Sequence, residues 1–69
     1  MADREIIELE GDTSLLDKQG WHLLTYFKSA DCSRAFNLAM DKAHNSERKT
    51  GLRSFEKDGE YFCEVWERW

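Results

Sequence analysis

The sequence predicts a small α+β domain: a mixed or antiparallel sheet of three to four strands with one main helix packed on one face. Two observations carry this prediction. Several short segments are rich in aromatic and β-favouring residues, and one segment repeats apolar residues at helical spacing. The 69 residues allow one domain, residues 1–69, in the order β-β-α-β-β.

The first strand is expected within residues 4–11, where isoleucine and leucine alternate with glutamate. Outward carboxylates discourage further strand pairing, so we expect this strand at an edge of the sheet. Residues 12–20 then form either one short helical turn or a loop. In the helical alternative Asp12 or Thr13 accepts the first free amide hydrogens, and Gly20 provides a left-handed exit.

Residues 21–28 are predicted to form the second strand, because aromatic and β-favouring residues dominate them. Apolar side chains fall on both faces, which indicates a central strand. We expect the odd-numbered residues to face the helix. His22, Leu24 and Tyr26 would then lie on the open face of the sheet.

The helix is predicted within residues 29–45, with Ser29 or Asp31 capping its start. Apolar residues recur there at spacings of three and four, and so lie on one stripe: Cys32, Ala35, Phe36, Ala39, Met40 and Ala43. Leu38 falls on the opposite, polar side, where we expect it to be exposed. The helix should end near residue 45.

Residues 52–69 read as a hairpin, because Asp58-Gly59 is a strong two-residue turn signal between alternating segments. A two-residue turn sets Arg53 opposite Glu64, an attractive pair, whereas a three-residue turn would set like charges opposite each other. The charges therefore favour the two-residue turn.

This register sorts the hairpin side chains onto two faces. The face with fewer charges should pack under the helix and carries Leu52, Ser54, Tyr61, Cys63 and Val65. The other face remains open and carries Phe55, Phe62 and Trp66, framed by Arg53, Glu60 and Glu64. The register leaves the placement of Trp69, at the chain end, open.

The candidate partner-binding surface is this open face, since contiguous exposed apolar area is uncommon on monomers. Its residues are Phe55, Phe62, Trp66, Tyr26, Leu24, Arg53 and Glu64. An alternative is that the N-terminal segment covers the rings as a second small core.

Composition narrows the classes of function. Fourteen acidic against ten basic residues give a net charge of −4, which disfavours nucleic acid as a partner. Two scattered cysteines and two scattered histidines lack the close spacing of zinc ligands, and no cofactor motif is present, so we expect neither metal nor cofactor. No apolar run has the roughly 20 residues that span a bilayer. The first ten residues carry charges where a signal peptide needs an apolar core, so secretion is not expected. With only two cysteines, we expect free thiols and a cytoplasmic protein.

These observations predict a non-enzymatic module that binds another protein, with a homodimer as one compatible form. Phage-type inhibitors and small regulatory subunits share this size and acidity. Two alternatives stay open. The aromatic face could stack on single-stranded nucleic acid, or Cys32 at the helix start could act as a thiol switch. Because Cys32 lies on the apolar stripe, we expect its thiol to be buried and inert, and Cys63 to be a small core residue.

Overall fold

The fold is α+β, as the sequence predicts. The structure is a computed structural model and describes residues 6–68. Its elements are β1 (Ile6–Glu8), α1 (Thr13–Lys18), β2 (Trp21–Ser29), α2 (Cys32–His44), β3 (Lys49–Lys57) and β4 (Glu60–Arg68). The four strands form one mixed sheet in the order β1-β3-β4-β2. β1 runs parallel to β3, and the other two pairs are antiparallel.

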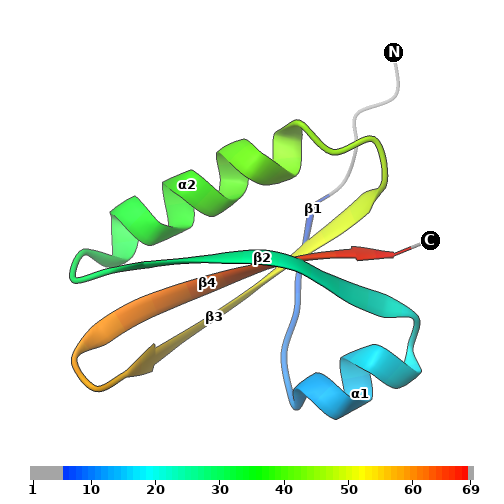
Figure 1. The fold of residues 1–69 in the computed structure, drawn as a ribbon, viewed down its shortest axis with the longest axis horizontal. Helices are drawn as coiled ribbons and strands as arrows, with labels where there is room; N and C mark the ends of the chain where they lie inside the picture. Colours follow the sequence, from blue (N-terminus) through cyan, green and yellow to red (C-terminus); the bar gives the residue numbers. More distant parts are fainter. Residues whose placement is uncertain (1–5, 69) are drawn as a thin grey trace.

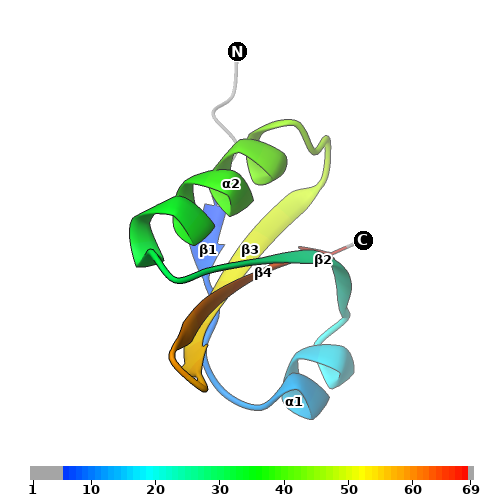
Figure 2. The ribbon, with the colours of Figure 1, turned by 60° about the vertical axis from the view of Figure 1, so that its left-hand side comes forward.

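The two helices lie on opposite sides of the sheet (Figures 1 and 2). The long helix α2 packs on one face through Ala35, Ala39 and Ala43, all of which are buried. Small side chains let the helix backbone approach the sheet closely. Together with three strand residues they form the first core: Ala35, Ala39, Ala43, Leu52, Cys63 and Val65.

A second core lies on the other face, beneath the N-terminal segment. It consists of Leu9, Leu16, Trp21 and Trp66. Leu16 is the buried residue of α1, and Leu9 follows β1 directly, donating its amide hydrogen to the carbonyl of Leu52 at 2.8 Å. The segment from β1 to α1 thus closes the face that α2 leaves uncovered at this end of the sheet.

The predicted start and end of α2 are confirmed, whereas the predicted capping of α1 is partly wrong. The Asp31 carboxylate accepts a hydrogen bond from the Ser33 amide at 2.9 Å, and the helix ends at His44. Residues 13–18 do form a short helix, and Gly20 adopts a φ of +91° at its exit. The side chain of Asp12, however, makes no capping hydrogen bond.

The hairpin has the register that the charges favour. Lys57 pairs with Glu60 and Arg53 with Glu64 across the two-residue turn. Asp58 has a φ of 53° and Gly59 a φ of 80°, and positive φ at both central residues is typical of the turn that matches the strand twist. β3 begins at Lys49, earlier than expected, because its first residues pair with the end of β4.

The prediction that residues 21–28 form a central strand is wrong. β4 lies between β3 and β2, so β2 is an edge strand of the sheet. β1 is the other edge, as expected. Apolar residues occur on both faces of β2 for a different reason: its two halves point in different directions.

A bulge at Leu24 divides β2. Leu23 pairs with Trp66 and Thr25 with Val65, so Leu24 is the extra residue between two successive partners on β4. Before the bulge, Trp21 and Leu23 therefore lie on the open face, contrary to the prediction that they face α2. After it, Thr25 and Phe27 face α2, as the odd-numbered positions were expected to do.

Candidate functional site

Three aromatic rings lie side by side on the open face, one from each of three adjacent strands. The register places Phe55 of β3 opposite Phe62 of β4, and Tyr26 of β2 lies beside Phe62. The Phe55 and Phe62 rings are stacked, with centroids 5.1 Å apart and planes at 4°. The Tyr26 and Phe62 centroids are 6.0 Å apart, and their planes are tilted by 37°. We call these three residues the aromatic row.

Exposure along the aromatic row is uneven. Tyr26 is 54% exposed, whereas Phe55 and Phe62 are only half-buried. The row is therefore most accessible at its β2 end, next to the edge of the sheet. Phe62 contacts Tyr26 from one side, and Phe55 stacks on Phe62 in turn.

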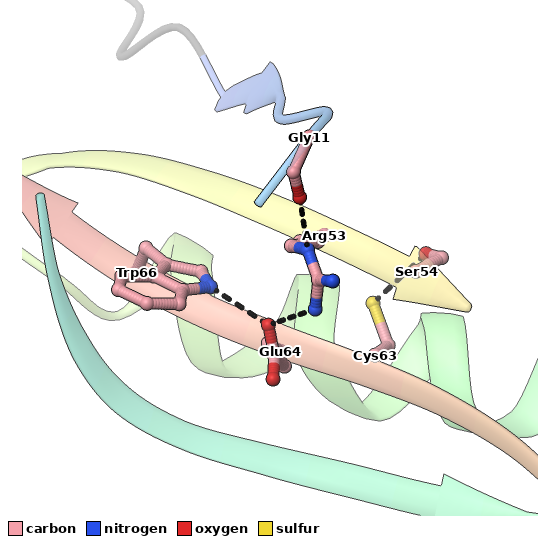
Figure 3. A network of polar contacts seen from close by, with 6 residues as sticks. All are labelled: Gly11, Arg53, Ser54, Cys63, Glu64 and Trp66. Carbon is pink, nitrogen blue, oxygen red and sulfur yellow. Dashed lines mark hydrogen bonds and ion pairs between the residues drawn. The ribbon is translucent and has the colours of Figure 1, made fainter. Parts of the chain in front are cut away.

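Arg53 joins the aromatic row to the N-terminal segment, and Figure 3 shows its bonds to Gly11 and Glu64. Its guanidinium carbon lies 4.8 Å from the centroid of the Phe55 ring, a cation–π arrangement. One terminal nitrogen donates to Glu64 Oε1 at 2.9 Å, and Nε donates to the carbonyl of Gly11 at 3.0 Å. The predicted pairing of Arg53 with Glu64 is thus a direct ion pair, and both side chains are largely shielded from solvent.

Trp66 does not belong to the accessible surface, although it lies on the predicted face. It is only 5% exposed, because Leu9, Leu16 and Trp21 pack around it. Its indole nitrogen donates to Glu64 Oε1 at 3.1 Å (Figure 3). The alternative that the N-terminal segment covers the rings therefore holds for Trp66, while Tyr26 remains outside that second core.

Leu24 is also misplaced by the prediction. It is exposed, but the bulge turns it away from the aromatic row. It lines a groove with Lys42 and Asn45 at the end of α2, on the helix side of β2. The expectation that even-numbered positions of β2 share the open face fails here for that reason.

Sequence reasoning missed Leu23. It pairs with Trp66 on the open face and is half exposed, so it extends the apolar area along β2 from Tyr26. Nothing in the residues around position 24 marks the bulge that places Leu23 there. Neither glycine nor proline stands near it.

The two thiols differ in their surroundings. Cys63 is buried, as expected, and accepts a hydrogen bond from the Ser54 hydroxyl at 3.4 Å. Burial raises its pKa above the ordinary 9.0. Cys32 is exposed, which contradicts the prediction of a buried thiol: α2 approaches the sheet through its alanines, and Cys32 and Phe36 on the flank of that stripe stay accessible.

Other kinds of site are scarce in the part of the chain that the structure describes. Within residues 6–68, no cluster of three or more histidine, cysteine or acidic side chains could hold a metal ion. Neither described helix has the length and apolar character needed to cross a membrane.

Three comparisons, with protein-family models, with curated proteins and with solved structures, find no match to this chain, so its function is argued from the geometry above.

Proposed function

We propose that the protein is a non-enzymatic, intracellular module that binds another protein by placing the aromatic row and Leu23 against its partner. The observation that carries the proposal is the Tyr26 ring, which is 54% exposed and contacts the Phe62 ring. A large, rigid and amphipathic ring of this kind is a favourable anchor at protein interfaces.

The available apolar surface is sufficient for an interface of moderate strength. Burying one large apolar side chain contributes about 1.5–3 kcal/mol before the costs of association are subtracted. Tyr26 and Leu23 are both about half exposed, and Phe55 and Phe62 add their open edges. Since the rings already pack on one another, binding would immobilise few side chains.

Charged side chains surround this apolar centre. Lys28 is opposite Phe62 on the strand beside it, and Arg53 lies against Phe55. Glu60 and Lys57 follow at the hairpin end of the same face. An apolar centre with a charged rim is the common anatomy of a protein–protein interface.

The same geometry makes single-stranded nucleic acid a less suitable partner. A base stacks on an aromatic ring through the free face of the ring. Phe55 and Phe62 turn their faces toward one another, and the Arg53 guanidinium lies over Phe55. The net charge of −4 adds repulsion of phosphates. A protein surface, which needs shape and apolar contact rather than free ring faces, fits better.

The proposal is tested by affinity capture from source-cell extract, followed by quantitative mass spectrometry, with wild type and two variants as baits. Tyr26→Glu places a charge in the aromatic row. Leu15→Glu is the matched control, because Leu15 is equally exposed but lies on α1. We expect specific partners to be captured by wild type and Leu15→Glu and lost with Tyr26→Glu. Retention of the same partners by folded Tyr26→Glu would show that the aromatic row is not the contact surface.

A further inference from the structure

The chain has two cysteines, and the fold brings both of them to one cavity. Cys32 is the first residue of α2, and Cys63 lies in β4 on the face that α2 covers. Both line a cavity of about 220 Å³ between the start of α2 and the β3–β4 hairpin, together with Ala35 and Ser54. The two cysteines are far apart in the sequence, so their meeting is a property of the fold.

The path of the chain explains this meeting. β2 ends at Ser29, which pairs with Tyr61 of β4, and Phe27 pairs with Cys63. The chain then turns, and α2 begins at Cys32 and runs back over the sheet. Figure 1 shows that α2 begins at the same end of the sheet as the β3–β4 hairpin. The first turn of α2 therefore lies over the part of β4 that contains Cys63.

Two further observations indicate that the sulfur atoms are near neighbours. Ala35 lies one turn after Cys32 on the same face of α2, and it is buried in the same core as Cys63. Its small side chain lets the helix backbone approach the sheet, and a disulfide needs this because it joins Cα atoms only about 4.4–6.8 Å apart. Burial is the main cause that raises the pKa of Cys63, and the nearby Cys32 sulfur adds to the rise. Charges influence one another over only about 10 Å.

The two thiols differ in access to solvent. Cys32 is exposed, whereas Cys63 is only 1% exposed. A small reagent in solution therefore reaches Cys32 first. The Ser54 hydroxyl donates to Cys63 Sγ at 3.4 Å (Figure 3), and this contact stabilises the negative charge of the sulfur when it acts as a nucleophile. An accessible thiol beside a sheltered second thiol is the typical arrangement of cysteine pairs that respond to oxidation.

We propose that Cys32 and Cys63 form a redox-sensitive pair, which a small-molecule disulfide converts into an internal disulfide that ties the start of α2 to β4. The Cys32 thiol loses its proton to solvent, and its thiolate attacks one sulfur of the small disulfide. The bond between the two sulfurs of the reagent breaks, and one small thiolate leaves and takes up a proton.

The second step closes the internal bond. The Cys63 thiol loses its proton, attacks the Cys32 sulfur of the mixed disulfide and displaces the second small thiolate. Two protein thiols are thereby oxidised, and one small disulfide is reduced to two thiols. Both cysteines lie on the α2 side of the sheet and the aromatic row on the other, so this reaction does not require the proposed protein-binding function.

The test equilibrates the intact, folded wild-type protein with mixtures of glutathione and glutathione disulfide, followed by acid quenching and mass spectrometry. We expect a product that is lighter than the reduced protein by two hydrogen atoms and carries no glutathione. Proteolytic mapping should show residues 32 and 63 linked. Glutathione that persists on Cys32 of the wild type, or a dimer joined through Cys32, would overturn the proposal, because either product shows that Cys63 does not reach Cys32.

Variants separate the roles of the two thiols. Cys63→Ala should accumulate glutathione on Cys32, because no second thiol displaces it. Cys32→Ala should react at least about tenfold more slowly than wild type, because Cys63 is buried and inaccessible to the reagent. Circular dichroism verifies that both variants fold. Reaction of folded Cys32→Ala at the wild-type rate would overturn the proposed order of attack.

A comparison with the unfolded chain shows whether the fold itself favours the bond. The same equilibration in concentrated urea measures how readily the two cysteines join without structure. We expect the folded protein to keep half of its disulfide against a reducing ratio about tenfold or more higher than the unfolded chain does. The oxidised protein should accordingly unfold at a higher urea concentration than the reduced protein. An equal or lower reducing ratio for the folded protein would overturn the proposal.

Discussion

Glu64 satisfies two donors with one carboxylate oxygen. Its Oε1 accepts from the Arg53 guanidinium at 2.9 Å and from the Trp66 indole at 3.1 Å. Because the Arg53 and Glu64 side chains are only 22% and 13% exposed, each charge depends on the other for the solvation it has lost. Arg53 also donates to Gly11 and lies against Phe55. Glu64, through Arg53 and Trp66, therefore links the aromatic row, the second core and the N-terminal segment.

The Cys63 thiol should make the free energy of unfolding fall at alkaline pH. Its buried thiol has a pKa raised above 9.0, chiefly by desolvation. As pH rises past 9.0, the thiol ionises in the unfolded chain before it ionises in the folded one, so the unfolded state gains stability first. The stabilisation due to the neutral thiol is therefore complete below that pH and is lost as pH approaches the folded-state pKa. We predict that the free energy of unfolding falls in this range, as measured by urea denaturation.

Cys63→Ala provides the reference, because it removes the Cys63 thiol and leaves the lysines and tyrosines, which also titrate at alkaline pH, in place. The difference in unfolding free energy between wild type and Cys63→Ala should shrink as pH rises above 9.0. Parallel curves for the two proteins across this range would contradict the prediction.

Among the elements, the hairpin and α2 were predictable because their determinants are local. The turn at Asp58-Gly59 and the charges beside it fix the register of β3 and β4. The spacing of the alanines fixes the buried face of α2. In each case neighbouring residues on one element, or on two joined by a turn, decide the structure.

The position of β2 was not predictable in the same way. Strand order depends on which distant segments pair, and β2 reaches β4 across the whole of α2 and β3. The bulge at Leu24 and the burial of Trp66 depend likewise on partners far along the chain. Hence the predicted site was right about the association of Phe55, Phe62 and Tyr26 and wrong about Leu24 and Trp66.

The alanine face of α2 yields a prediction for this element. Ala39 is fully buried in the first core, so a larger side chain would have to push the helix from the sheet. We predict that Ala39→Leu lowers the free energy of unfolding by about 1–3 kcal/mol, as overpacking in cores does. Chemical denaturation measures this. Asn37→Leu, on the exposed side of the helix, should change it little, and equal losses for both variants would refute the packing argument.

In the whole molecule, two cores share one sheet. The first lies under α2 and the second under the N-terminal segment. That segment is attached where β1 pairs with residues 50–52 of β3, and there Gly51 leaves room for Leu9. A Cβ atom placed on Gly51 would lie 2.6 Å from the Leu9 side chain, which no real contact allows.

Gly51→Ala should therefore loosen the N-terminal segment more than the α2 core. We predict a loss of about 1–3 kcal/mol in the free energy of unfolding. Faster hydrogen exchange should occur at Leu9 and in α1, with less change in α2. In a Leu9→Ala background the same substitution should cost clearly less, and full additivity of the two substitutions would show that the steric argument is wrong.

The bulge at Leu24 has a consequence for how this chain tolerates change in length. Trp21 and Phe27 both occupy odd positions of one strand, yet they serve different cores on opposite faces. Deletion of Leu24 would remove the extra residue and leave the pairs on either side of it unchanged, so Trp21 and Leu23 would keep their place on the open face. If the strand instead kept its length and paired without the bulge, Leu24 would lie opposite Trp66. Trp21 and Leu23 would then turn toward α2 and leave the second core.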